Sequence, residues 1–188
     1  MAEHPSDEWP CAAAIEDDGL VDVDALLAAV ADRLRQAGWR VRGLLMTYPE
    51  GGEGCARPMV LVDVDSREPY LVSQPLGRDS RACRADPQGF ARASRVLRQA
   101  ADEAPDLVIC NRFGGLEAEG GGFRAELLDI LARGLPLLTT VASRHVEAWQ
   151  RFTGGAAVLP AQVEAIDAWI ARLPAAAALA ARAGHGPR

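Results

Sequence analysis

The stretch at residues 106–124, DLVICNRFGGLEAEGGGFR, constrains the fold of this chain more than any other segment. The apolar run at residues 107–110 follows Pro105 and precedes polar residues, a pattern typical of a buried strand. We expect the strand to end at residues 111–112, a glycine-rich loop to follow it, and a helix to begin near Phe123. Ligands of open parallel sheets bind beyond the carboxyl ends of the strands, where loops lead into helices. The stretch therefore predicts a strand that ends at a binding site.

Strands and helices are expected to alternate along the rest of the chain. Apolar runs predict strands at residues 11–15, 40–47, 59–65, 70–74, 135–141 and 156–159, and helices are predicted at residues 25–37, 86–103 (capped by Asp86, with Pro87 in first position), 123–133, 143–152 and 161–173. The polar residues 66–69 indicate a hairpin. We predict one α/β domain with a mostly parallel sheet at residues 11–174. A flexible lead is expected at residues 1–10. The alanine-rich tail at residues 175–188 is expected to be either a frayed helix or disordered.

The composition limits the chemistry of the chain. With 188 residues, 49% of them hydrophobic, it is long enough for one substantial core. Its formal net charge of −6 argues against a general nucleic-acid-binding surface, because such surfaces are basic. All 20 basic residues are arginines. The absence of lysine excludes a Schiff-base lysine, a lysine general base and the lysine of a phosphate-binding P-loop.

Cysteine and histidine spacing gives no sign of a metal site. Cys11, Cys55, Cys83 and Cys110 form no C-x-x-C pair, and His145 has no partner at ligand spacing, so we expect no metal and no cofactor. We expect Cys11 and Cys110 to be small buried side chains of strands. The chain starts without a signal peptide, and no apolar run approaches the ~20 residues of a membrane span. A cytoplasmic protein without a membrane partner is therefore predicted.

The first predicted strand, loop and helix stand where a P-loop would stand. A P-loop, G-x-x-x-x-G-K-[ST], wraps phosphates with backbone amides and holds them with its lysine. The loop here has one glycine, Gly19, and carries the carboxylates of Glu16, Asp17, Asp18, Asp22 and Asp24, which would repel a triphosphate. Two interpretations stay open: an acidic surface loop that caps the following helix, or a site for a divalent cation.

The order of a strand, this degenerate loop, a helix, the sequence RVRGLLMT and a hairpin resembles the small nucleoside-triphosphatase family of the P-loop class. The motifs N-R-F-G, L-E-A-E-G-x-G and G-x-P-[VL]-L-T resemble more closely a bacterial family of uncharacterised proteins, often encoded near molybdate-transport genes. The resemblance covers about residues 11–173. It implies a P-loop-NTPase-like three-layer sandwich with a small hairpin insertion.

Departures from the triphosphatases bear on activity. The acidic pair with which that family holds magnesium and activates water is replaced here by Asn111 and Arg112, and only Glu117 stays in register. The acidic loop replaces the lysine loop. The resemblance therefore implies the fold with degenerate Walker motifs, and it weakens the expectation of nucleoside-triphosphate hydrolysis.

Polar groups are expected to converge at the carboxyl ends of the strands. Guanidinium forks, hydroxyls and helix amino termini suit an oxyanion, such as phosphate, a nucleotide phosphate or a tetrahedral metal oxyanion. The predicted ligand-binding residues are Asn111, Arg112, Gly114, Gly115, Glu117, Thr140, Ser143, Arg144 and Arg81. Alternatively, Arg112 pairs with Glu117 or Glu119 and only orders its own loop.

Three functions are compatible with these residues. We favour a non-hydrolytic binding protein for a small anionic or phosphorylated ligand, which the resemblance links to molybdenum or tungsten handling. The first alternative is an enzyme that hydrolyses or transfers nucleotides with Glu117 or Glu119 as its base. The second is a regulatory or protein-interaction module, for example a homodimer formed through residues 48–58 or through the edge of the hairpin.

Overall fold

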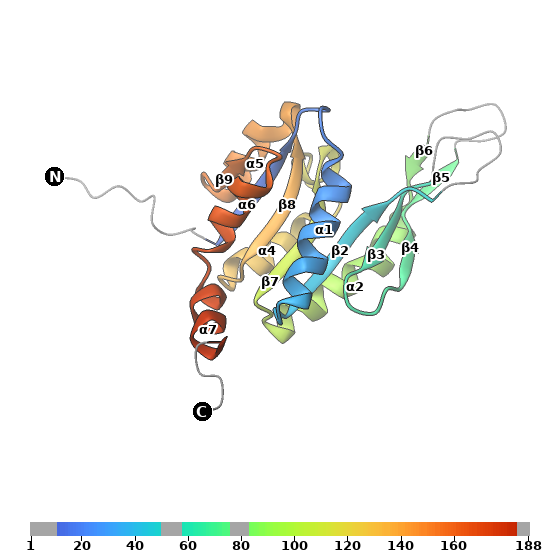
Figure 1. Cartoon of the computed structure of the whole chain (residues 1–188). Helices are drawn as coiled ribbons and strands as arrows, with labels where there is room; N and C mark the ends of the chain where they lie inside the picture. Colours follow the sequence, from blue (N-terminus) through green and yellow to red (C-terminus); the bar gives the residue numbers. More distant parts are fainter. Residues whose placement is uncertain (1–10, 50–57, 76–82, 184–188) are drawn as a thin grey trace.

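A computed structural model describes residues 11–49, 58–75 and 83–183. A seven-stranded sheet lies at its centre, in the order β4-β3-β2-β7-β8-β1-β9 (Figure 1). The strands are β1 (Ala12–Asp17), β2 (Val41–Thr47), β3 (Val60–Asp63), β4 (Pro69–Leu71), β7 (Leu107–Phe113), β8 (Leu137–Ala142) and β9 (Ala157–Leu159). Strands β2, β7, β8, β1 and β9 run parallel, whereas β3 and β4 form the predicted antiparallel hairpin. The predicted α/β class with a mostly parallel sheet is confirmed.

Helices cover both faces of the sheet, which gives three layers (Figure 1). They are α1 (Val23–Gln36), α2 (Pro87–Glu103), α3 (Gly115–Ala118), α4 (Arg124–Ala132), the short 3₁₀ helix η2 (Ser143–His145), α5 (Val146–Thr153), α6 (Val163–Ile170) and α7 (Pro174–Ala183). Helices α2, α4 and α5 pack on one face, and α1, α6 and α7 pack on the other. Alternate residues of each strand feed the two cores: Val108 and Cys110 face one, Leu107 and Ile109 the other.

Two helices begin at aspartates whose side chains cap them. Asp22 accepts a hydrogen bond from the Ala25 amide at the start of α1, and Asp86 accepts one from the Gln88 amide at the start of α2, where Pro87 is the first residue. Aspartate suits these positions because its carboxylate satisfies a free amide at the positive end of the helix. The predicted cap at Asp86 is confirmed.

Some strand boundaries differ from the expectations. Strand β7 runs to Phe113, just beyond the predicted end at residues 111–112, and the polar Asn111 inside it is fully buried. The strand expected at residues 70–74 is divided between β4 and β5 (Ser73–Pro75). Strand β5 pairs with β6 (Cys83–Ala85) in a second, two-stranded sheet.

The carboxyl-terminal tail forms a helix, which is one of the two states expected for it. Helix α7 forms within the alanine-rich segment, and Ala175, Ala176 and Leu179 pack against the core beside α6. The predicted lead at residues 1–10 lies outside the described residues. Within the part of the chain that the structure describes, no helix has the length and hydrophobicity that a membrane crossing requires.

The two strand cysteines differ in burial. Cys110 is fully buried, as expected, and burial raises the pKa of its thiol well above its ordinary value. Cys11 is partly exposed and lies directly before β1, so the expectation of a buried strand residue is wrong for it. Cys55 lies outside the described residues.

Candidate functional site

The carboxyl ends of β1, β7 and β8 lie together at one edge of the sheet, because β8 is the parallel neighbour of both other strands (upper edge in Figure 1). Strand β1 leads through α1 on one face, whereas β8 leads through α5 on the opposite face. Neighbouring parallel strands whose connections leave to opposite faces form a switch point, which is where open α/β sheets bind ligands. The residues predicted at the ends of β7 and β8 therefore lie at the binding edge of this fold.

Asn111 at the end of β7 is held from both sides. Its Oδ1 accepts a hydrogen bond from Thr140 Oγ1 at 2.9 Å, and its Nδ2 donates to Asp24 Oδ1 at 2.8 Å. Both Asn111 and Thr140 are fully buried. Thr140 therefore lies behind Asn111 and fixes the orientation of its amide, whose donor points toward the start of α1.

Arg112 reaches the acidic segment that follows β1. Its Nη2 lies 3.0 Å from Asp24 Oδ2, and its Nη1 lies 3.4 Å from Asp17 Oδ2. The alternative in which Arg112 pairs with Glu117 or Glu119 is therefore wrong: the neighbouring strand β1 and helix α1 bring other carboxylates closer. The Arg112 side chain remains 30% exposed, so part of the guanidinium is open to solvent.

Glu117 organises the glycine-rich loop. Its Oε2 accepts a hydrogen bond from the Gly114 amide at 2.9 Å, and its Oε1 accepts one from the Phe123 amide at 3.0 Å. The side chain is almost completely buried. Gly122 packs directly against it, since a Cβ atom there would lie 2.0 Å from Glu117 Oε1. Both carboxylate oxygens thus serve backbone amides and hold the loop in shape.

The end of β8 supplies basic and hydroxyl groups. Arg144 is exposed, and its Nε donates to His145 Nε2 at 3.2 Å. Among the described residues, its guanidinium has no carboxylate partner. His145 lies beside Gly115, where a Cβ atom would come within 3.8 Å of its ring, and Ser143 Oγ lies 3.4 Å from the Asp17 carbonyl oxygen. The β7 and β8 loops therefore adjoin each other at this edge.

The acidic segment occupies its own backbone amides. The amides of Gly19 and Leu20 donate to the carboxylates of Asp17 and Asp18 at 3.1 and 2.9 Å. Together with the Asp22 cap, these bonds use amides of the kind that a P-loop offers to phosphates. The interpretation as an acidic loop that caps the helix is confirmed. Within residues 11–49, 58–75 and 83–183, no group of His, Cys, Asp and Glu side chains has the arrangement of a metal site.

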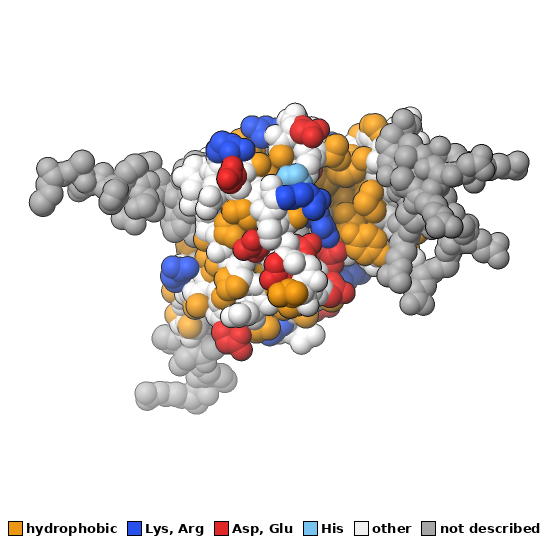
Figure 2. All heavy atoms as spheres, turned by 90° about the horizontal axis from the view of Figure 1, so that it is seen from above, with side chains coloured by type: hydrophobic (Ala, Val, Ile, Leu, Met, Phe, Trp, Pro, Cys, Tyr) orange, Lys and Arg blue, Asp and Glu red, His pale blue; other side chains and the backbone are white. Residues whose placement is uncertain are grey.

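Several predicted residues line one cavity of about 250 Å³, namely Asn111, Arg112, Gly114, Gly115 and Glu117. The other walls are mainly apolar and include Met46, Tyr48, Met59, Leu61, Phe90, Leu116 and Phe123. Figure 2 looks onto this edge and shows an apolar hollow next to a short strip of basic side chains. We call this hollow the carboxyl-edge cavity. It can receive an apolar group while an anionic group meets the guanidinium groups.

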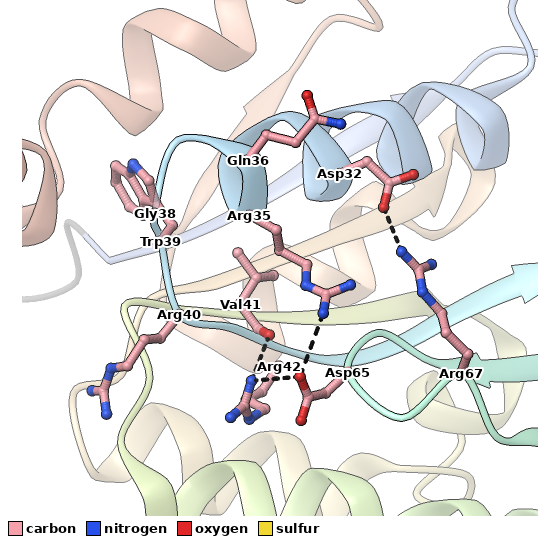
Figure 3. A pocket seen from close by; sticks show the side chains of 10 residues that line it. All are labelled: Asp32, Arg35, Gln36, Gly38, Trp39, Arg40, Val41, Arg42, Asp65 and Arg67. Carbon is pink, nitrogen blue, oxygen red and sulfur yellow. Dashed lines mark hydrogen bonds and ion pairs between the residues drawn. The ribbon is translucent and has the colours of Figure 1, made fainter.

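A larger hollow of about 530 Å³ lies at the opposite edge, near the start of β2 (Figure 3). Its arginines are engaged within the chain. Arg35 and Arg42 both approach Asp65 Oδ1, at 3.4 and 3.2 Å, and Arg67 lies 2.7 Å from Asp32. These pairs join α1 and β2 to the hairpin, so the arginines already have partners within the chain. We therefore place the candidate site at the carboxyl edge.

The sequence did not indicate two residues of the site. Asp24 and Tyr48 both lie beside Arg112, but neither is among the residues predicted to bind a ligand. The strand order could have revealed them, because it places the start of α1 beside the end of β7. Arg81 lies outside the described residues, so its role stays a prediction.

Comparison with known proteins places the chain in a family. A family model described as "Protein of unknown function (DUF2478)" matches residues 11–169. The chain belongs to this family.

Two further matches concern a relative and a solved structure. The molybdenum import ATP-binding protein ModC 2 of Bradyrhizobium diazoefficiens is 38% identical to this member over 149 residues, which are 79% of this chain but only 17% of that protein. The solution structure of a human cancer-related nucleoside triphosphatase matches with a TM-score of 0.58 and 18% identity, over 78% of this chain and 86% of that chain. This likeness shows a P-loop-NTPase-like fold, as the resemblance implied.

Proposed function

We propose that this member of the family is a non-hydrolytic protein that binds a small oxyanion or a phosphorylated ligand at the carboxyl edge of its sheet. One observation carries the proposal: the exposed Arg144 guanidinium, without a carboxylate partner among the described residues, lies at the edge that holds Arg112 and the carboxyl-edge cavity. Arginine is well suited to oxyanions because its planar fork offers several charge-assisted hydrogen bonds.

Several groups that hydrolysis would need are engaged or missing. The chain contains no lysine to hold the β- and γ-phosphates. Amides of the acidic segment are taken by Asp17, Asp18 and Asp22. Both oxygens of Glu117, the first candidate for a base, accept backbone hydrogen bonds. These features support binding without phosphate-bond cleavage.

The link to molybdenum or tungsten handling belongs to the same proposal. The relative with 38% identity is named for molybdenum import and ATP binding, but the match covers 17% of it. Molybdate and tungstate are tetrahedral oxyanions of the kind that a pair of arginines can hold. They are therefore probes to compare with phosphate and with nucleotides.

Isothermal titration with phosphate, molybdate, tungstate, ATP and GTP tests the proposal. We expect heat with at least one of these anions and a loss of about tenfold or more in affinity on Arg144→Ala, because a charge-assisted contact is removed. Arg151→Ala is the matched control, since among the described residues this exposed arginine pairs only with Glu147 within α5. Absence of binding by all five anions, or equal loss in both variants, would contradict the proposal.

A second assay tests separately the claim that the protein does not hydrolyse nucleotides. It measures phosphate release from ATP or GTP in the presence of magnesium, and we expect no release above background. Release that disappears on Glu119→Gln would instead support the enzyme alternative.

A further inference from the structure

The most complete set of donors at the carboxyl edge already holds a carboxylate, that of Asp24. Asn111 Nδ2 donates to Asp24 Oδ1 at 2.8 Å, while Arg112 Nη2 lies 3.1 Å from Oδ1 and 3.0 Å from Oδ2. The Tyr48 hydroxyl lies beside them: it accepts a hydrogen bond from Arg112 Nη2 at 3.5 Å and is itself hydrogen-bonded to Asp24. Burial raises the pKa of Tyr48 most, the charge of Arg112 lowers it, and Asp24 raises it further.

These donors are the kinds that an oxyanion ligand would use. An amide, a guanidinium and a phenol all point hydrogen at acceptor oxygens, and the charged donor gives the strongest bonds. The Asp24 side chain is only 15% exposed and is thus enclosed much as a bound anion would be. Asn111 and Arg112, which hold the Asp24 carboxylate, also line the carboxyl-edge cavity. Asp24 itself lines the neighbouring hollow, which shares Met46 and Tyr48 with that cavity.

We propose, in an inference that rests on the proposed function, that Asp24 is an internal competitor: its carboxylate competes with the ligand for Asn111 and Arg112. The anionic group of the ligand takes the place of the Asp24 carboxylate on Asn111 and Arg112, and Asp24 thereby determines which anions bind. Asp24 lies in the first turn of α1, directly after β1, so the folded chain keeps its carboxylate close to the donors. An intramolecular group of this kind competes at an effective concentration of about millimolar or higher.

Competition of this kind makes the site selective. A small monovalent carboxylate such as acetate would make the same hydrogen bonds to Asn111 and Arg112 as the Asp24 carboxylate makes, so it should not displace Asp24. A ligand succeeds by adding a contact that Asp24 cannot make, either with Arg144 or with the apolar walls of the cavity. Tetrahedral dianions and phosphate esters meet this requirement.

The summed charge around Arg112 predicts how the variant Asp24→Asn affects anion binding. Arg112 faces two carboxylates, Asp24 and the more distant Asp17, so the three groups carry a net charge of −1. Asp24→Asn brings this sum to zero and leaves an amide oxygen that can still accept from Asn111. The variant thus removes the competing charge while keeping the size of the side chain.

Titration of molybdate and inorganic phosphate into the full chain tests the inference. Asp24→Asn should bind the anion about tenfold more tightly than the unchanged protein, because one charge-assisted competitor is gone. Asp18→Asn is the matched control. It makes the same charge change in the same segment, where Asp18 bonds only the Leu20 amide within the part of the chain that the structure describes. It should change affinity less than about twofold, since exposed charges are screened by water and salt.

The outcomes separate the inference from the proposed function. Binding by the unchanged protein with equal or weaker binding by Asp24→Asn overturns the internal competitor and leaves the proposed function standing. Equal gains in Asp24→Asn and Asp18→Asn also overturn it, because the effect would then be general electrostatics. No binding by any of the three proteins overturns both.

A measurement on the unchanged protein avoids dependence on the variant's folding. The carboxyl carbon resonance of Asp24 and the side-chain amide resonances of Asn111, followed by NMR during a molybdate titration, should move together as Asp24 leaves its donors. If molybdate saturates the protein while the resonances of Asp24 and Asn111 keep their chemical shifts, the inference is overturned.

Discussion

At the scale of single residues, the buried amide of Asn111 joins three elements. Its oxygen is bonded to Thr140 of β8 and its nitrogen to Asp24 of α1, while its own backbone continues β7. A buried polar side chain is stable only when its donors and acceptors are satisfied. The two bonds therefore explain how an asparagine stands inside the sheet, and they aim its amide at the binding edge.

Thr140→Val should weaken both stability and binding. The change keeps the shape of the side chain but removes the hydroxyl that holds Asn111 Oδ1, which leaves a buried acceptor without its donor. We expect a loss of about 1 to 3 kcal/mol in the free energy of unfolding, measured by chemical denaturation. Affinity for molybdate or phosphate should fall as well, because the amide is no longer fixed.

Thr140→Ser provides the control, since it restores the hydroxyl and should restore most of both quantities. Full stability in Thr140→Val would show that the hydrogen bond does not hold Asn111.

The site residues could be predicted only in part. Asn111 and Arg112 follow a buried strand, and that position alone marked them as candidates. Their partner Asp24 is 87 residues away from Asn111 in the sequence, and it meets them only because β1 lies beside β8. Pairing of this kind depends on strand order, which local sequence patterns do not contain.

At the scale of elements, strand β2 depends on a glycine at its centre. Gly43 has a φ of +126°, and a Cβ atom there would lie 1.8 Å from the carbonyl oxygen of Ile109 in β7. Its own carbonyl accepts a hydrogen bond from the Val64 amide next to β3. Close approach of the two strands therefore requires a residue without a side chain.

Gly43→Ala should destabilise the sheet strongly. The added methyl group must push β2 and β7 apart, and the backbone conformation is also unfavourable for alanine. We expect a loss of about 3 kcal/mol or more in the free energy of unfolding. Thermal or chemical denaturation measures the change.

Gly38→Ala is the matched control for this prediction, because Gly38 also has a positive φ of +88° but no neighbouring atoms within 4 Å of a Cβ. It should cost only about 1 to 2 kcal/mol, the price of the backbone conformation alone. Equal losses in the two variants would contradict the importance of the close approach.

Elements were predictable where a local signal is strong. The cap of α2 at Asp86 and the hairpin of β3 and β4 follow from residue types at fixed spacing. The end of β7 was predicted slightly too early, because the polar Asn111 breaks the apolar run and only tertiary contacts satisfy it. For helix α7 the sequence left a helix and disorder both open, because the packing that orders it beside α6 is a tertiary contact.

At the scale of the whole molecule, the chain has a P-loop-NTPase-like fold in which aspartates bond the groups that follow β1. Asp17 and Asp18 bond amides of the loop after β1, Asp22 caps α1, and Asp24 holds Arg112. The net charge of −6 disfavours anions at long range, so binding must come from local contacts at the carboxyl edge. A homodimer formed through residues 48–58 or through the hairpin edge stays a prediction.

The central claim is that an anion is held directly by arginine at the carboxyl edge. The most direct measurement is an anomalous difference map from a crystal grown without phosphate or sulfate and soaked in tungstate. We predict a peak in contact with the guanidinium of Arg144 or Arg112, at the wall of the carboxyl-edge cavity. No peak at this edge, or a peak only among Arg35, Arg42 and Arg67 at the opposite edge, would contradict the claim.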